Sequence, residues 1–110
     1  MAEIGGGASA FEADARDQAS LARLFEQAGA VDHLVVTVGP GSPKQRYASF
    51  LEQPVDDARA LFDNKFWAQY LCAKLAAPHI AKGGSITLFG GGASRRPVKA
   101  MAALAAVQAA

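Results

Sequence analysis

The hydrophobic positions of this chain fall into short apolar runs and longer periodic stretches. Residues 33–38 and 85–89 are almost unbroken runs of apolar and β-branched side chains, and each run stops at a glycine-rich turn. Such runs are typical of strands that are buried on both faces of a parallel sheet. The pattern therefore predicts an α/β fold, with ligands bound where these strands end.

Helical periodicity precedes the first of these strands. Leu21, Leu24 and Phe25 lie at positions i, i+3 and i+4 and form one apolar stripe. Asp17 is suited to cap the first turn, because its carboxylate can accept a backbone N–H. Gly29 stands in the position expected of a C-terminal glycine. These signals predict a helix over residues 18–27.

A second, longer periodic stretch predicts a helix over residues 55–81. Apolar residues track two of its faces, so one face is expected to pack on the sheet and the other to meet another surface, such as a partner subunit. Pro78 is expected to bend or end this helix. A further helix is expected to begin after Pro97.

The remaining segments complete a strand–helix alternation. Residues 1–8 are glycine-rich and expected to be irregular, and residues 9–13 form a candidate short strand. Gly83-Gly84 is expected to break the chain before the last strand. Helical crossovers between apolar strands predict parallel pairing, and hence a partial Rossmann-type, doubly wound sheet of three strands and three helices.

Composition narrows the class of protein. The 110 residues allow one domain, 51% hydrophobic residues allow a core, and a net charge of +1 gives no reason to expect nucleic acid or an anionic membrane as a partner. Cys72 is the single cysteine, which fits a reducing, cytoplasmic setting. His33 and His79 have no ligands at metal-site spacing, so we expect no metal. No apolar stretch approaches the ~20 residues that span a bilayer.

The order of these segments resembles the middle of the short-chain dehydrogenase/reductase family, from about residue 11 to residue 110. EADARDQASLARLF looks like the family's third strand and following helix, and VDHLVVTVG looks like its fourth strand. DNKFWAQYLCAKLAAPHI looks like the long helix, and GGSITLFGGG like the fifth strand. The resemblance implies hydride transfer between NAD or NADP and a carbonyl or alcohol substrate.

The resemblance also implies cofactor-binding residues. Asp14 stands where the family binds the adenine amino group, and the backbone N–H of Ala15 would face the ring; the alternative is that Asp14 is a turn residue that bonds its own backbone. Thr37, Val38 and Gly39 match the residues beside the adenosine ribose. The alternative for Gly39 is a plain strand-ending turn.

Asn64 matches the asparagine that, in the family, helps to hold a water of the proton relay. Asparagine is a poor residue for a helix interior, because its side chain competes for backbone hydrogen bonds. A kink or a buried water at Asn64 would explain its presence, and an exposed position is the alternative.

The family's other catalytic positions carry unsuitable residues here. Gly91 stands in place of the serine, Leu104 in place of the tyrosine and Gln108 in place of the lysine. Leucine has no proton to transfer and glutamine carries no charge, so the family's standard mechanism cannot run on these residues. A literal Tyr-x-x-x-Lys at Tyr70 and Lys74 falls on the long helix and is interpreted as packing and a solvated charge.

The family's first two strands and its glycine-rich turn are missing from this sequence. We therefore expect an interior piece or a divergent remnant of a larger fold, truncated at both ends. Self-association through helix 55–81 and the C-terminal helix is expected, since these two helices build the family's dimer interface. The alternative to a part of an oxidoreductase is a non-catalytic remnant that self-associates or binds a nucleotide.

Overall fold

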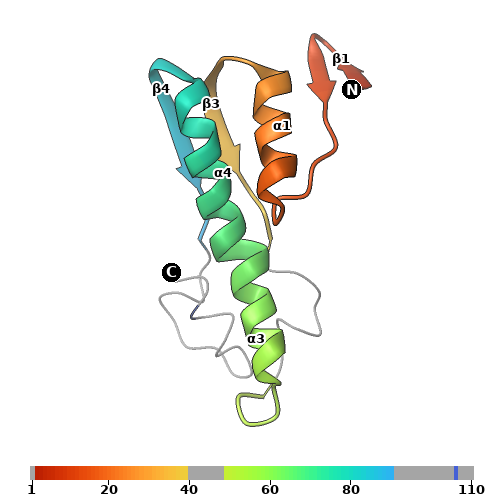
Figure 1. Cartoon of the computed structure of the whole chain (residues 1–110), viewed down its shortest axis with the longest axis vertical. Coiled ribbons are helices and arrows are strands. Elements are labelled where there is room, and N and C mark those ends of the chain that lie inside the picture. Colours follow the sequence, from red (N-terminus) through yellow and green to blue (C-terminus); the bar gives the residue numbers. More distant parts are fainter. Residues whose placement is uncertain (1, 40–48, 91–105, 107–110) are drawn as a thin grey trace.

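The computed structural model describes residues 2–39, 49–90 and 106 (Figure 1). Predictions that fall on the other residues, including the helix after Pro97, lie outside the described part of the chain. The described elements, in chain order, are β1 (Ala2–Gly5), β2 (Ala8–Ala10), α1 (Gln18–Ala28), β3 (Val31–Val36), α3 (Val55–Leu61), the π-helical segment η1 (Phe62–Trp67), α4 (Ala68–Ala76), the 3₁₀ turn η2 (Ala77–His79) and β4 (Ile80–Leu88).

Strands β3 and β4 form a parallel pair, with Val36 opposite Leu88, and helices α1 and α4 lie against one face of it (Figure 1). The predicted α/β architecture with a parallel sheet is confirmed. The prediction that these strands are buried on both faces is wrong. Val35 is 58% exposed, because alternate side chains of a strand point to opposite faces and the described helices cover only one.

The N-terminal residues form an antiparallel hairpin, in which Ala2 of β1 lies opposite Ala10 of β2. The prediction of irregular structure over residues 1–8 is therefore wrong, and the strand expected at residues 9–13 lies at Ala8–Ala10, outside the parallel sheet. Gly6 and Gly7 connect the two strands with φ of 60° and 81°. Two successive residues at positive φ close a tight hairpin turn, and glycine adopts that conformation without strain.

Helix α1 begins and ends at the expected residues. The carboxylate of Asp17 accepts a hydrogen bond from the backbone N–H of Ala19 at 3.0 Å. Gly29 has a φ of 73°, and its N–H donates to the carbonyl of Phe25 at 3.0 Å. These two caps satisfy backbone groups that a helix end would otherwise leave unpaired.

The long helix runs without interruption from α3 through η1 into α4, and a 3₁₀ turn that contains Pro78 ends it. The predicted start at residue 55 and the role given to the proline are confirmed, whereas the predicted end at residue 81 is wrong because β4 begins at Ile80. The segment in its middle that contains Asn64 is π-helical, and the Asn64 side chain is half-buried rather than exposed.

Gly83 and Gly84 deform β4 rather than breaking the chain before it, which corrects the prediction. The pairing passes from Val31 opposite Ile80 directly to His33 opposite Ser85, so extra residues of β4 are accommodated between these pairs. A Cβ atom on Gly84 would collide with the carbonyl oxygen of Asp32. Glycine is therefore needed where the two backbones approach each other.

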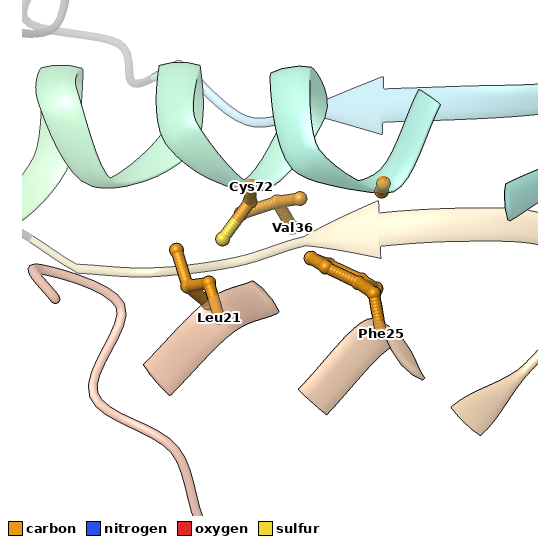
Figure 2. Close-up of a cluster of buried hydrophobic side chains, with 5 residues drawn as sticks. Leu21, Phe25, Val36 and Cys72 are labelled. Carbon is orange, nitrogen blue, oxygen red and sulfur yellow. The ribbon is translucent and has the colours of Figure 1, made fainter. Parts of the chain in front are cut away.

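The core joins three elements at the centre of the fold (Figure 2). Leu21 and Phe25 of α1 pack against Val36 of β3 and against Cys72 and Ala76 of α4, and all five side chains are buried. This packing fixes α4 over the sheet and so sets where the helix passes the carboxyl ends of the strands.

Candidate functional site

Gln69 of α4 connects the helix to the carboxyl ends of both strands. Its side-chain Nε2 donates a hydrogen bond to the carbonyl of Phe89 at 3.0 Å and makes a longer contact, 3.5 Å, with the carbonyl of Val38. Gln69 is buried, and these two carbonyl groups give its amide hydrogen-bond partners within the protein. The edge of the sheet at which a ligand is expected is thus held by a helix side chain.

Thr37, Val38 and Gly39 follow β3 at this edge, as the sequence predicts. Thr37 is exposed, whereas Val38 is half-buried against the core. A Cβ atom built on Gly39 would meet no atom within 4 Å, so among the described residues the space beside this backbone is open. A ligand can approach the backbone there closely.

Lys65 lies on the same helix face as Gln69, four residues earlier, and is only 7% exposed. Burial lowers the pKa of its ammonium group, because removal from water disfavours the charged form. Sequence analysis missed both residues as site candidates. The available signal was a polar pair at i and i+4 on a stripe that also carries Leu61, Cys72 and Ala76.

Asn64 points to a different place from Lys65. It is half-buried and lines a cavity of about 490 Å³ between η1 and the start of α1. The lining consists of Asp14, Arg16, Asp17, Ala60, Asp63, Asn64, Trp67 and Leu71. The structure thus brings Asn64 together with Asp14, and not with Thr37, Val38 and Gly39, which do not line this cavity.

Asp14 belongs to a hydrogen-bonded turn before α1. Its carboxylate oxygen Oδ1 accepts from the backbone N–H of Arg16 at 2.9 Å and from the Nε of the same residue at 3.3 Å. Its own N–H donates to the hydroxyl of Ser20 at 2.9 Å. These bonds to Arg16 lower the pKa of the Asp14 carboxyl group. The turn geometry weighed as an alternative is present, while Ala15, half-buried, packs on the core.

An aromatic cluster on the long helix joins Phe66, Trp67 and Tyr70. The ring of Trp67 meets those of Phe66 and Tyr70 edge to face, with centroids 4.9 and 5.5 Å apart, and Tyr70 stacks on Phe66 at 6.4 Å. Lys74 is exposed. The interpretation of Lys74 as a solvated charge is confirmed. Tyr70 contacts the two neighbouring rings, as a packing residue would, but its side chain stays nearly half exposed.

Three residues decisive for catalysis in the resemblance, Gly91, Leu104 and Gln108, lie outside the described residues. In the described part of the chain, no helix is long and apolar enough to span a membrane.

Comparison with known proteins identifies the family. The family model described as enoyl-(acyl carrier protein) reductase matches residues 1–110. A small-chain dehydrogenase solved in complex with NADPH is 39% identical, with a TM-score of 0.81 over 88% of this chain and 43% of its own. The structure of BdcA in complex with NADPH is 34% identical, with a TM-score of 0.78 over 94% of this chain and 41% of its own. The chain belongs to the short-chain dehydrogenase/reductase family.

A curated relative is the cyclic-di-GMP-binding biofilm dispersal mediator protein of Escherichia coli (strain K12). It is 34% identical over 105 residues, which cover 94% of this chain and 43% of the relative. The chain therefore spans less than half the length of each of these three relatives. The predicted family and its α/β fold with parallel strands are confirmed, and NADPH is bound in two of the related structures.

Proposed function

We propose that this chain forms the nucleotide-facing middle part of an oxidoreductase that transfers hydride between NAD or NADP and a carbonyl or alcohol. The observation that carries the proposal is the parallel β3–β4 pair, whose carboxyl ends are held by Gln69. Ligands of open α/β sheets bind beyond such ends. The likeness to a dehydrogenase that binds NADPH supports the same site.

The described residues fit one part of such a cofactor. The open space beside Gly39 accommodates a ribose close to the backbone, and exposed Thr37 offers a hydroxyl next to Val38. Half-exposed Asp14 has carboxylate capacity beyond its bonds to Arg16, and the N–H of Ala15 follows it. We assign these five residues to cofactor binding and keep Asn64 as the candidate member of the proton relay.

Turnover by these 110 residues alone is not part of the proposal. A bound nicotinamide supplies the hydride chemistry, but a general acid must protonate the carbonyl oxygen. Leu104 and Gln108 cannot act as that acid or stabilise its charged form. The chain is therefore proposed to bind the cofactor without catalysing its oxidation.

Fluorescence titration with NADPH and NADH tests this proposal. We expect a saturable increase in nicotinamide emission, which Gly39→Val weakens at least ~10-fold by filling the open space, with no loss of thermal stability. Ala8→Val, on the exposed surface of the hairpin, is the matched control and leaves binding unchanged. No change in emission with millimolar cofactor overturns the proposal.

Cyclic-di-GMP is a second candidate ligand. The 34% identity to a cyclic-di-GMP-binding protein extends over 94% of this chain, so the shared region includes the sheet edge described above. Isothermal calorimetry with cyclic-di-GMP, with cyclic-di-AMP as the control, separates this candidate from NADPH. If neither compound gives heat of binding, cyclic-di-GMP is excluded as a ligand.

We also propose that the chain is a homo-oligomer, associated through helix 55–81 and the C-terminal helix. Trp67 and Tyr70, neighbours on the long helix, each expose about half of their surface. Large aromatic groups in one exposed patch favour an interface. Sedimentation velocity should show an oligomer that Trp67→Ala with Tyr70→Ala dissociates, and a monomer of the unaltered chain contradicts this proposal.

A reducing, cytoplasmic location completes the proposal. It is supported by a single cysteine, Cys72, which is buried in the core as a free thiol. Fractionation of cells that express the tagged chain tests it, and recovery from the periplasm would contradict it.

A further inference from the structure

Lys65 is a buried cation placed beyond the carboxyl edge of the sheet. Figure 1 shows the long helix running past the ends of β3 and β4 on its way from α4 back to α3. Gln69 marks the height of the strand ends, because its amide bonds to the carbonyl of Phe89. Four residues of helix rise roughly 6 Å, so Lys65 lies about one turn past those ends.

The π-helical segment decides which polar side chain occupies that position. Asn64 lines the cavity beside α1, whereas its neighbour Lys65 takes the buried face that continues from Leu61 to Gln69. An added residue in a helical turn rotates the residues on either side of it, and such π-bulges are frequent at functional sites. The buried face of the helix, one turn beyond Gln69, thus carries a lysine rather than the asparagine.

Holding an ammonium group there costs folding free energy. Lys65 is 7% exposed, and its surroundings on balance disfavour the charged form, as the direction of its pKa shows. An apolar side chain of similar length would fill the same space without that cost. Costly buried polar groups are concentrated at sites that bind ligands or catalyse reactions.

We propose that Lys65 is a ligand-binding residue whose ammonium donates hydrogen bonds to ribose or phosphate oxygens of a nucleotide lying across the ends of β3 and β4. Charge-assisted bonds of this kind are stronger than neutral ones, and more so in a site that excludes water. The inference rests on the proposed function and names a residue for it. NADPH and cyclic-di-GMP both carry these oxygens, so the shared chemistry is the sugar-phosphate group.

The test compares Lys65→Met and Lys65→Arg with Lys74→Met, a matched removal of an exposed lysine on the same helix. NADPH binding is followed by fluorescence, cyclic-di-GMP binding by calorimetry, and each variant is also melted. We expect Lys65→Met to weaken, by at least ~10-fold, the affinity for whichever of the two nucleotides the unaltered chain binds. The melting temperature should not fall. Lys65→Arg should keep binding within about threefold, and Lys74→Met should match the unaltered chain.

The outcomes separate this inference from the function on which it rests. If the unaltered chain binds neither nucleotide, the proposed function fails and the inference fails with it. If the chain binds and Lys65→Met binds equally well, only the inference is overturned. A second neutral variant, Lys65→Gln, is melted as well. A lower melting temperature in both Lys65→Met and Lys65→Gln marks Lys65 as a structural residue and also overturns the inference. Retained folding of these variants, with binding restored in Lys65→Arg, supports the inference.

Discussion

The segments α4 and η1 are consecutive parts of one helix, yet they present different chemistry to the sheet side. In α4, Cys72 and Ala76 complete an apolar core with α1 and β3 (Figure 2). In η1, the buried position is occupied by Lys65, and the neighbouring Asn64 lines a cavity. The part of the helix above the sheet supplies apolar packing, and the part beyond the sheet edge carries the polar groups to which we assign ligand binding.

The difference follows from what lies opposite each segment. Above the sheet, α4 meets apolar side chains, and regular α-helical geometry keeps a continuous stripe against them. Past the strand ends there is no sheet surface to cover, so a change to π-helical geometry there does not expose the core. Gln69 lies where α4 passes the strand ends. It is buried like the core residues of α4, and it is polar like the residues of η1.

The largest expected effect is on the apolar side of this comparison. Leu21→Ala removes a side chain that is 2% exposed from the contact between α1 and α4. The lost burial and the cavity left behind should lower the free energy of unfolding by about 2–5 kcal/mol. Urea denaturation measures it, with Leu51→Ala, at a site 90% exposed, as a control within about 0.5 kcal/mol of the unaltered chain. Equal effects of the two substitutions would contradict the assignment of the core.

The next effect is expected at the boundary. Gln69→Leu keeps the volume but leaves the carbonyl of Phe89 without its side-chain donor, which should cost about 1–3 kcal/mol of unfolding free energy. Gln27→Leu, at an exposed position of α1, is the control and should change little. Amide hydrogen exchange should increase first at the ends of β3 and β4. Uniform exchange throughout the sheet would count against a local role for Gln69.

In η1 a substitution is expected to raise the free energy of unfolding, by less than the two preceding substitutions lower it. Lys65→Met should raise the unfolding free energy at pH 7 by about 1 kcal/mol, because it removes a charge whose burial is unfavourable. The native pKa of Lys65 is lowered, so the native state releases its proton before the unfolded state does. The stability of the unaltered chain therefore rises as the pH passes through that lowered pKa toward the unfolded value of about 10.4.

Denaturation of both chains between pH 7 and pH 10 checks this sign. The advantage of the Lys65→Met variant should shrink as the pH rises. An advantage that stays constant or grows would show that the ammonium is not destabilising in the native state.

The smallest expected effect concerns reactivity rather than stability. Cys72 is 6% exposed, and burial raises the pKa of its thiol. Because the thiolate is the reactive form, an aromatic disulfide reagent at pH 8 should modify Cys72 only as the native structure opens. The rate should increase sharply in Leu21→Ala, and rapid reaction of the folded, unaltered chain would contradict the packing of α4.

Short-range signals in the sequence were sufficient for much of this fold. Periodicity and the caps at Asp17 and Gly29 predicted α1, because the hydrogen bonds of a helix are local. The apolar runs predicted the two strands that pair in parallel, although not which of their faces is exposed. The pair Gly6-Gly7 is also a hairpin signal in the sequence. The strands on either side of it are short and rich in alanine and glycine, so they lack the β-branched and aromatic pattern by which strands are predicted from sequence.

The candidate site was predictable only in part. The sequence determined the family-like order of elements and placed Thr37, Val38 and Gly39 at the carboxyl end of a strand. It did not determine which of two adjacent residues, Asn64 or Lys65, lies on the buried face of the helix. That choice depends on the π-helical geometry of η1, which changes the direction of successive side chains between α3 and α4. Because the packing of α4 in the core fixes one end of this segment, only the tertiary structure decided it.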